Sequence, residues 1–323
     1  MHSISLDKLW YTRHPLRWVL FPLACVYRAM SWLRRHYLQR FCQHSFSVPI
    51  IVVGNISVGG VGKTPLVIAL VQQLQARGLR VGIVSRGYGA TMNDFPHEVS
   101  VNESAELVGD EPLLLAKKAG CPVVIAPDRV QAVRCLLDKH SCQVIVSDDG
   151  LQHYKMGRAI EIVVIDGVRG LGNRLCLPAG PLRESAKRLQ QVDFIVVNGG
   201  ECPRGYRMDL RPGDFTQLLN GKSIPVAELS CPVAAVAAIG HPQRFFSTLR
   251  ALGVTFEPYP FTDHHSFQPK ELDLPEKMVV MTEKDAVKCQ AFATEKMYFL
   301  PVEAVIERGF WDALWTHVAL SKL

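Results

Sequence analysis

A glycine-rich segment followed by lysine and threonine has the residue types that most clearly indicate chemistry. It reads Gly54-Asn-Ile-Ser-Val-Gly-Gly-Val-Gly-Lys-Thr-Pro65 and follows the apolar run Val48–Val53. An apolar stretch with helical spacing comes next and ends at Gly78. In this order, the backbone N–H groups of a tight loop and the positive end of a helix form a site for phosphate. We expect Lys63 to contact the β- and γ-phosphates of a nucleotide and the Thr64 hydroxyl to bind Mg²⁺.

One position of this segment departs from the strict pattern. The usual form, G-x-x-x-x-G-K-[ST], has glycine where this sequence has Ser57. Gly59, Gly60 and Gly62 still supply backbone freedom, so the departure weakens the motif without removing it. A chance Gly-Lys-Thr in a loop is the alternative, and the strand and helix on either side argue against it. The residues predicted to bind nucleotide are Asn55, Ser57, Val58, Gly59, Gly60, Val61, Gly62, Lys63, Thr64 and Pro65.

A pair of carboxylates supplies the expected metal ligand. Asp148 and Asp149 end the apolar run that begins at Gln143, and Gly150 follows them. In phosphate-transferring proteins an aspartate at the end of a neighbouring strand holds Mg²⁺. Adjacent side chains of a strand point to opposite faces, so only one of the two faces Thr64, and the sequence does not decide which. Asp-Asp-Gly is also common in ordinary turns, which is the alternative.

Two further segments contain groups that could accept a proton. Phosphoryl transfer to a hydroxyl requires such a group near the γ-phosphate. Asp110, in Gly109-Asp-Glu-Pro112, is one candidate, and its alternative role is a helix cap. His264 or His265, next to Asp263, is the other, because histidine titrates near neutral pH. A solvated loop histidine is the alternative there.

The elements that must position these residues are short β-branched runs alternating with helices. The expected helices include 111–118 and 129–139. The alternation indicates an α/β fold of the P-loop NTPase type, with a mainly parallel sheet covered by helices on both faces. Ligands then bind beyond the carboxyl ends of the strands, where polar clusters occur at 85–89, 127–129 and 148–153. The expected strands are 48–53, 81–85, 123–126, 144–147, 160–165 and 194–198.

The chain is long enough for two domains and an additional N-terminal arm. Glycine and proline in 208–230 indicate a linker, so we predict a phosphate-binding domain at 45–222 and a smaller α/β domain at 223–323. The smaller domain has apolar runs at 233–239, 254–259, 278–281 and 297–302 and a final amphipathic helix near 310–320. Thr282-Glu-Lys-Asp285 follows one of these runs, where a capping role and a functional role are equally supported.

The first 44 residues form a basic and aromatic arm. They carry seven Lys or Arg residues against one acidic residue, whereas the rest of the chain carries 29 basic and 29 acidic residues. The apolar run Trp18–Leu33 is interrupted by Pro22 and Arg28 and falls short of the ~20 residues that a membrane span needs. Because Trp, Tyr and Arg favour the headgroup region, we expect the arm to lie on a membrane surface. Two amphipathic helices packed on the protein itself are the alternative.

Composition excludes other classes of protein. The charge is balanced outside the arm, which argues against a nucleic-acid-binding body. The nine cysteines are an odd number and include no C-x-x-C pair, which argues against a disulfide framework or a zinc site. Scattered thiols are typical of a reducing compartment, here the cytoplasm. No obligate protein partner is indicated.

Taken together, these segments resemble the tetraacyldisaccharide 4′-kinase family, the lipid A 4′-kinases of Gram-negative bacteria. Serine at position 57 belongs to the family's own form of the loop. The matching segments occur in order along the chain: Val53–Pro65, Ser85–Gly89, Gly109–Pro112, Ser147–His153, Leu177–Glu184, Asp263–His265 and Thr282–Lys288.

The resemblance implies a kinase that transfers the γ-phosphate of ATP, with Mg²⁺, to the 4′-hydroxyl of a lipid-linked disaccharide 1-phosphate. The product would be lipid IVA, made at the cytoplasmic face of the bacterial inner membrane. The resemblance also implies that Asp110 deprotonates the acceptor with His264 as its partner, and that two domains close over the nucleotide. Metal ligands implied are Thr64, Asp148, Asp149 and Glu184. Substrate-binding residues implied are Arg86, Tyr88, Arg129, Gln152, His153 and Arg183.

The alternative function is a membrane-associated ATPase switch of the partitioning and septum-positioning type. Such proteins use K-G-G-x-G-K-T, and this sequence has Val58 in place of the first lysine. A switch would also have no need of the Asp263-His264-His265 segment.

Overall fold

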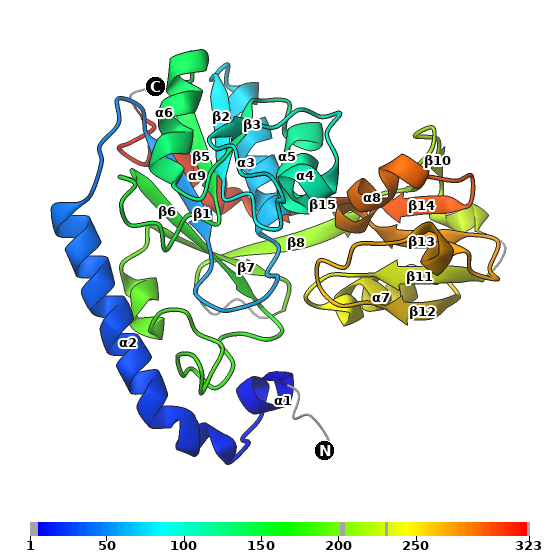
Figure 1. Cartoon of the computed structure of the whole chain (residues 1–323), viewed down its shortest axis with the longest axis horizontal. Coiled ribbons are helices and arrows are strands. Elements are labelled where there is room, and N and C mark those ends of the chain that lie inside the picture. Colours follow the sequence, from blue (N-terminus) through cyan, green and yellow to red (C-terminus); the bar gives the residue numbers. More distant parts are fainter. Residues whose placement is uncertain (1–5, 201–203, 230–231, 322–323) are drawn as a thin grey trace.

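The computed structural model describes residues 6–200, 204–229 and 232–321 and contains two β-sheets, each covered by helices (Figure 1). The larger sheet has the strand order β15-β8-β7-β6-β1-β5-β2-β4-β3. Its neighbouring strands are parallel except in the pairs β3–β4 and β8–β15. The predicted α/β class with a mainly parallel sheet is confirmed. The strands are β1 (Ile50–Gly54), β2 (Val81–Ser85), β3 (His97–Glu98), β4 (Val123–Ile125), β5 (Val144–Asp148), β6 (Ile160–Asp166), β7 (Phe194–Asn198), β8 (Tyr206–Pro212) and β15 (Val302–Ile306).

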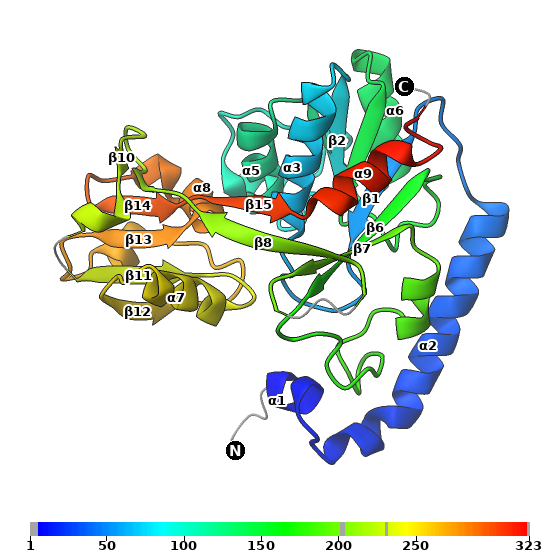
Figure 2. The same cartoon turned by 180° about the vertical axis from the view of Figure 1, so that it is seen from behind.

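Helices pack on both faces of this sheet (Figure 2). One core contains apolar residues of α3 (Lys63–Ala76), α5 (Asp110–Ala119) and α9 (Arg308–Thr316), and the short α4 (Ala105–Val108) adds to it. The other core contains residues of α6 (Arg129–Lys139). Because both faces are covered, strands such as β1 and β2 are buried along their whole length and have no polar alternation.

The smaller sheet has the strand order β10-β9-β14-β13-β11-β12. Strands β11–β14 pair in parallel, and β9 pairs antiparallel with β10 and β14. Helices α7 (Pro242–Ala251) and α8 (Glu283–Cys289) accompany this sheet. The strands are β9 (Phe215–Gln217), β10 (Ser223–Ile224), β11 (Val233–Ala237), β12 (Phe256–Pro260), β13 (Val279–Thr282) and β14 (Met297–Leu300).

Two strand connections join the sheets, and they lie side by side. The chain passes from β8 to β9 through Gly213 and returns from β14 to β15 through Pro301. The Gly213 N–H donates to the Pro301 carbonyl at 3.0 Å, next to the antiparallel β8–β15 ladder. The two domains are therefore linked by one narrow two-stranded connection (Figure 2).

The predicted boundary between the domains was wrong in two respects. The predicted linker at 208–230 contains most of β8 together with β9 and β10, because the mixed burial of β8 gives it no clear apolar pattern. The end of the chain returns to the larger domain: the ring of Phe310 in α9 lies 5.6 Å from that of Phe194 in β7. Residues 302–320 thus belong to the first domain and not to the second.

The arm consists of α1 (Leu6–Tyr11) and the long α2 (Leu16–Phe41), which continues through Pro22 (Figure 1). Trp10 of α1 donates from Nε1 to the Pro178 carbonyl at 3.1 Å, and Arg35 of α2 donates to Gln191 at 2.8 Å. Much of the apolar surface of α2 is exposed, however, at Trp18, Val19, Phe21, Leu23, Val26, Met30, Trp32, Leu33, Tyr37 and Phe41. Among the described residues, no helix is both long enough and apolar enough to cross a bilayer.

Candidate active site

The loop between β1 and α3 is shaped by contacts among its own residues. Asn55 Nδ2 donates to the carbonyls of Ser57 at 2.7 Å and Gly59 at 3.3 Å. Gly62, immediately before α3, has φ of 88°, and a Cβ there would lie 2.1 Å from Asn198 Nδ2. Only glycine fits this position. The loop therefore presents main-chain N–H groups at the start of α3, an arrangement that can bind an anion.

Lys63, the first residue of α3, lies against Asp149. Its Nζ is 3.0 Å from Asp149 Oδ1 and 3.4 Å from Asn55 Oδ1. Asp149 Oδ2 lies 3.5 Å from Arg183 Nη1. Burial opposes ionisation of Asp149, but the charges of Lys63 and Arg183 lower its pKa to about 2. Asp149 is therefore a carboxylate that holds two cations at the edge of the loop.

Asp148 is placed very differently, although it is the neighbouring residue. It is the last residue of β5 and is buried, and its Oδ2 accepts a long 3.5 Å hydrogen bond from Ser85 Oγ. Its Oδ1 has no hydrogen-bond partner within the described part of the chain. Burial and the nearby Glu111 carboxylate raise the pKa of Asp148 to about 7. A buried oxygen with unused lone pairs fits a cation ligand better than the paired oxygens of Asp149.

Protein side chains alone do not complete a metal site. Residues 6–200, 204–229 and 232–321 contain no group of three or more His, Cys, Asp or Glu side chains that could hold a metal ion. Mg²⁺ binds through one or two carboxylates plus phosphate oxygens and water. Asp148 and Thr64 fit this type of site, in which the nucleotide supplies the remaining ligands.

The loop opens into a cleft of about 1490 Å³ between the two domains. The six residues predicted to bind substrate, Arg86, Tyr88, Arg129, Gln152, His153 and Arg183, all line it. The same cleft extends to the arm, where α2 contributes Tyr27, Met30, Ser31, Arg34 and Leu38. One continuous cavity thus connects the glycine-rich loop between β1 and α3 with an apolar helix.

Two basic residues of the cleft differ in charge. Arg129 is only 5% exposed, and burial lowers its pKa to about 10, so it stays charged at neutral pH. Its Nε has no hydrogen-bond partner among the described residues. His153 Nε2 lies 3.2 Å from Asp128 Oδ1. Burial and the charge of Arg129 lower the pKa of His153 to about 4, so this ring is neutral.

Asp110 and His264, which are 154 positions apart in the sequence, meet across the cleft. His264 Nδ1 lies 2.9 Å from Asp110 Oδ2. Asp110 begins α5 in the larger domain and is 5% exposed, whereas His264 lies on the cleft wall after β12 of the smaller domain. His264 has φ of 59°, a conformation unusual for histidine that typically persists at functional positions. Its ring lies 4.9 Å from that of Tyr88.

The hydrogen bond between Asp110 and His264 shifts the pKa of both side chains. The hydrogen bond to Asp110 raises the pKa of His264 above its usual 6.5. Burial alone would raise the pKa of Asp110, but the hydrogen bond from His264 and the charge of Lys284 hold it below 3.8. His265 has a different environment, because its Nε2 lies 3.0 Å from Glu271 Oε2. Of the two histidines left open by the sequence, the structure pairs His264 with Asp110.

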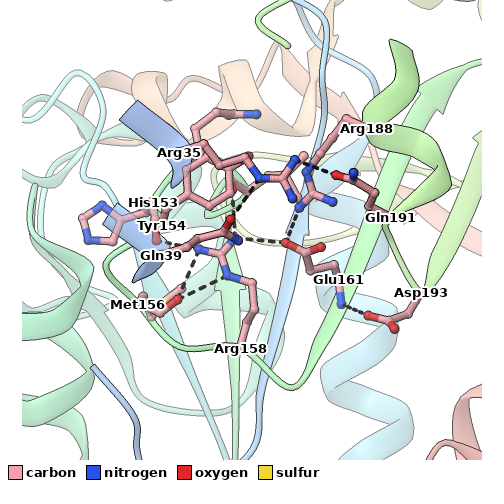
Figure 3. A network of polar contacts seen from close by, with 12 residues as sticks. Arg35, Gln39, His153, Tyr154, Met156, Arg158, Glu161, Arg188, Gln191 and Asp193 are labelled. Atoms are coloured by element: carbon pink, nitrogen blue, oxygen red, sulfur yellow. Dashed lines mark hydrogen bonds and ion pairs between the residues drawn. The ribbon is translucent and has the colours of Figure 1, made fainter. Parts of the chain in front are cut away.

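Glu184 is held by a buried network next to the cleft. Its Oε1 accepts from Gln152 Nε2 at 2.9 Å, and its Oε2 accepts from the Tyr154 hydroxyl. Figure 3 shows the adjoining part, in which Arg158 and Arg188 both contact Glu161 and the Arg35 guanidinium lies over Tyr154. Both oxygens of Glu184 therefore have protein partners in this structure. Its role as a Mg²⁺ ligand stays a prediction.

Comparisons with known proteins identify the family of this chain. A family model described as tetraacyldisaccharide-1-P 4′-kinase matches residues 16–319. The chain belongs to this family. Tetraacyldisaccharide 4′-kinase of Legionella pneumophila (strain Lens) is 57% identical over 99% of both chains. The protein of the same name from Aeromonas hydrophila is 46% identical over 96% of this chain and 94% of its own length.

A solved structure of the same family supports the fold. LpxK from Aquifex aeolicus, in complex with ATP, superposes with a TM-score of 0.77 and 28% identity over 94% of this chain and 99% of that chain. Membership in the tetraacyldisaccharide 4′-kinase family disfavours the ATPase switch that the sequence left as the alternative.

The sequence did not predict two contacts of the site, those of Asn198 and Arg244. Asn198 donates from Nδ2 to the Val61 carbonyl at 2.8 Å and so supports the glycine-rich loop between β1 and α3. Arg244, from α7 of the smaller domain, donates to Asn198 Oδ1 at 2.6 Å. Asn198 ends β7, and a polar residue at the carboxyl end of a parallel strand is a signal that could have identified it. No local signal marks Arg244, because its contact depends on the packing of the two domains.

Proposed function

We propose that this protein transfers the γ-phosphoryl group of ATP to the 4′-hydroxyl of a tetraacyldisaccharide 1-phosphate and forms lipid IVA. Its family and its relatives of 46–57% identity support the reaction. The observation that carries the proposal is the continuous cleft, in which a phosphate-binding loop, His264 of the proton-accepting pair and an apolar helix line one cavity. The acceptor has a polar hydroxyl and several acyl chains, and a cleft of this composition suits such a molecule.

The residues have distinct roles in the transfer. The hydroxyl oxygen forms a bond to the γ-phosphorus, the bond from that phosphorus to the β–γ bridging oxygen breaks, and ADP leaves with the electron pair. The hydroxyl proton passes to the Asp110–His264 pair, in which His264 lines the cleft and Asp110 lies behind it. Lys63, exchanged from Asp149 onto the phosphates, stabilises the negative charge that develops there.

The other predicted ligands surround this centre. Thr64 and Asp148 would hold Mg²⁺, which supplies positive charge against the phosphate oxygens when it is bound. Arg129 has an unused buried N–H, and a substrate phosphate is a suitable acceptor for it. Arg86 and Arg183 line the same cleft and add to its positive charge.

The reaction is tested with γ-labelled ATP, Mg²⁺ and tetraacyldisaccharide 1-phosphate in detergent micelles. We expect label to enter the lipid as a new phosphomonoester, and no label to leave ATP when the acceptor is omitted. Release of labelled inorganic phosphate without acceptor, with an unlabelled lipid, would instead identify an ATPase.

We also propose that the arm binds the cytoplasmic face of the inner membrane without crossing it. The exposed apolar residues of α2 and the seven basic residues of the arm support this location. Glutamate at Val19 and Met30, which are 71% and 65% exposed, should reduce sedimentation with vesicles that contain phosphatidylglycerol. Val168→Glu is the matched control, because Val168 is 76% exposed but lies outside the arm. Equal sedimentation of all variants would contradict the proposal.

A further inference from the structure

The proposed reaction assigns no role to the segment from Thr282 to Lys288. Thr282 ends β13 and caps α8, where its Oγ1 accepts from the Asp285 N–H at 3.1 Å. The cap orients the first turn of α8 so that two of its side chains extend to α5 of the larger domain. Glu283 Oε1 lies 2.7 Å from Lys118 Nζ, and Lys284 Nζ lies 2.8 Å from Glu111 Oε1. Two ion pairs therefore join the domains beside the cleft.

The two pairs differ in what lies next to them. Lys284 Nζ is also 3.8 Å from Asp110 Oδ2, the oxygen that contacts His264, and 4.0 Å from Asp263 Oδ1. Burial opposes the charge of Lys284, but the carboxylates of Glu111 and Asp110 raise its pKa above the usual value, so it is an ammonium ion at any pH of interest. No such contact to the Asp110–His264 pair is made by Lys118 in the described part of the chain.

We propose that Lys284 is a positioning residue for the Asp110–His264 pair. Its ammonium group fixes the Asp110 carboxylate, keeps it ionised, and balances the charge of Glu111 and Asp263 around it. The inference rests on the proposed function, since it assigns a role within the same reaction.

The physical reason is the concentration of negative charge at this point. Three carboxylates, those of Asp110, Glu111 and Asp263, lie within 4.0 Å of one ammonium group. A buried carboxylate that loses its cation either takes up a proton or moves toward water, and both changes remove it as a proton acceptor. Asp263 is also the neighbour of His264 in the sequence, so repulsion between Asp263 and Glu111 would move the histidine away from α5.

Lys284 neutralises these carboxylates from the other side of the domain interface. Asp110 and Glu111 belong to the larger domain, whereas Lys284, Asp263 and His264 belong to the smaller one. Among the described residues, Asp110 and Glu111 form their ion pairs with His264 and Lys284 of the smaller domain. The acceptor pair is therefore complete in the same arrangement that encloses the cleft.

The test compares Lys284→Met with Lys118→Met in the full-length protein. Each variant removes one ammonium group from an ion pair between α5 and α8, so a role in domain contact alone predicts similar effects. We expect kcat of Lys284→Met to fall about 10- to 100-fold with little change in KM for ATP, because the acceptor pair is misplaced while the phosphate-binding loop is intact. Lys118→Met should stay within about threefold of the unmodified protein, since Lys118 pairs with Glu283 and not with Asp110.

The pH profile supplies a readout that a purely structural role would not change. The charged groups that face the pair come from α5, from α8 and from the loop after β12; they are Glu111, Lys284, Lys288 and Asp263. The charge of Lys284 lowers the pKa of both Asp110 and His264. Its removal should therefore move the acid limb of kcat to higher pH, and Lys284→Arg should restore the limb and most of the rate.

Several outcomes would overturn the proposal. It is wrong if Lys284→Met and Lys118→Met lose equal activity, or if the acid limb of Lys284→Met stays in place. Lys284→Gln replaces Lys284→Met if the latter does not fold, because glutamine can still hydrogen-bond to Glu111 without a charge. If the unmodified protein transfers no phosphate to the lipid, the proposed function fails; if it does so and Lys284→Met matches its rate, only the role of Lys284 fails.

Discussion

The phosphate-binding loop and the Asp110–His264 pair lie in one cleft but depend on very different stretches of chain. The loop takes its shape from contacts within the larger domain, such as those of Asn55 with Gly59 and of Asn198 with Val61. The pair joins residues 154 positions apart, one from each domain. The loop can therefore form whenever the larger domain folds, whereas the pair also requires the domains to meet.

Substitutions in the loop and in the Asp110–His264 pair should therefore cause different kinds of defect. A change in the loop acts within the larger domain. A change in the pair acts on a contact between the two domains, which are joined through β8 and β15. Variants in the two regions should differ in kinetic signature as well as in size.

The largest effect is expected for Lys63→Ala. Loss of the ammonium group removes the main charge against the phosphates, and transfer of labelled phosphate should fall about 10³-fold. Asp149 would also lose its nearest cation and retain only Arg183. Lys139→Ala, on the exposed end of α6, is the control. Retention of half the activity would show that the loop does not bind phosphate in the way described.

Asp110→Asn tests the other region. We expect kcat to fall about 10²-fold, because the acceptor pair loses its carboxylate and takes up the hydroxyl proton less readily, while KM for ATP changes little. Steady-state rates measured over a range of ATP concentrations separate the two parameters. Asp138→Asn, an exposed position on α6, controls for the loss of a carboxylate. If KM for ATP rose and kcat did not change, Asp110 would be a nucleotide contact or a helix cap.

Substitutions of His264 and its neighbour His265 can be compared directly, and both should reduce kcat less than Asp110→Asn does. His264→Asn should reduce kcat about 10- to 100-fold, since it removes the partner of Asp110 from the cleft wall. His265→Asn should stay within about twofold, because that ring contacts Glu271 and aromatic residues instead. The rates are compared at saturating ATP and acceptor. A larger loss in His265→Asn than in His264→Asn would reverse the assignment.

The same contrast explains what the sequence could predict. β1, the loop, and α3 are consecutive, so apolar runs, glycines and helical spacing identified them together. The strands β2, β5, β6 and β7 were found for the same reason, since each is largely buried and contains a run of apolar residues. Local patterns were sufficient wherever local contacts determine the structure.

The parts that the sequence did not reveal depend on distant contacts. β8 has mixed burial and gave no clear pattern, and β15 with α9 returns to a domain that the chain had left 90 residues earlier. The approach of His264 to Asp110 came only from the family resemblance, and the ion pair between Lys284 and Glu111 was not predicted at all. Spacing along the chain contains no information about side chains that meet only after two domains pack.

The smallest expected effect is a pH dependence of stability that arises from the pair. The folded pKa of His264 is raised, so its contribution is full below 6.5 and is lost as pH rises through the raised value. The folded pKa of Asp110 is lowered, so its contribution is present above 3.8 and is lost as pH falls below that. The pair should therefore stabilise the protein most between about pH 4 and 6.5.

Thermal unfolding of the unmodified protein and of His264→Asn, measured from pH 4.5 to 9, tests this expectation. The difference in unfolding temperature should be largest near pH 6 and should shrink at higher pH, whereas a constant or growing difference would contradict it.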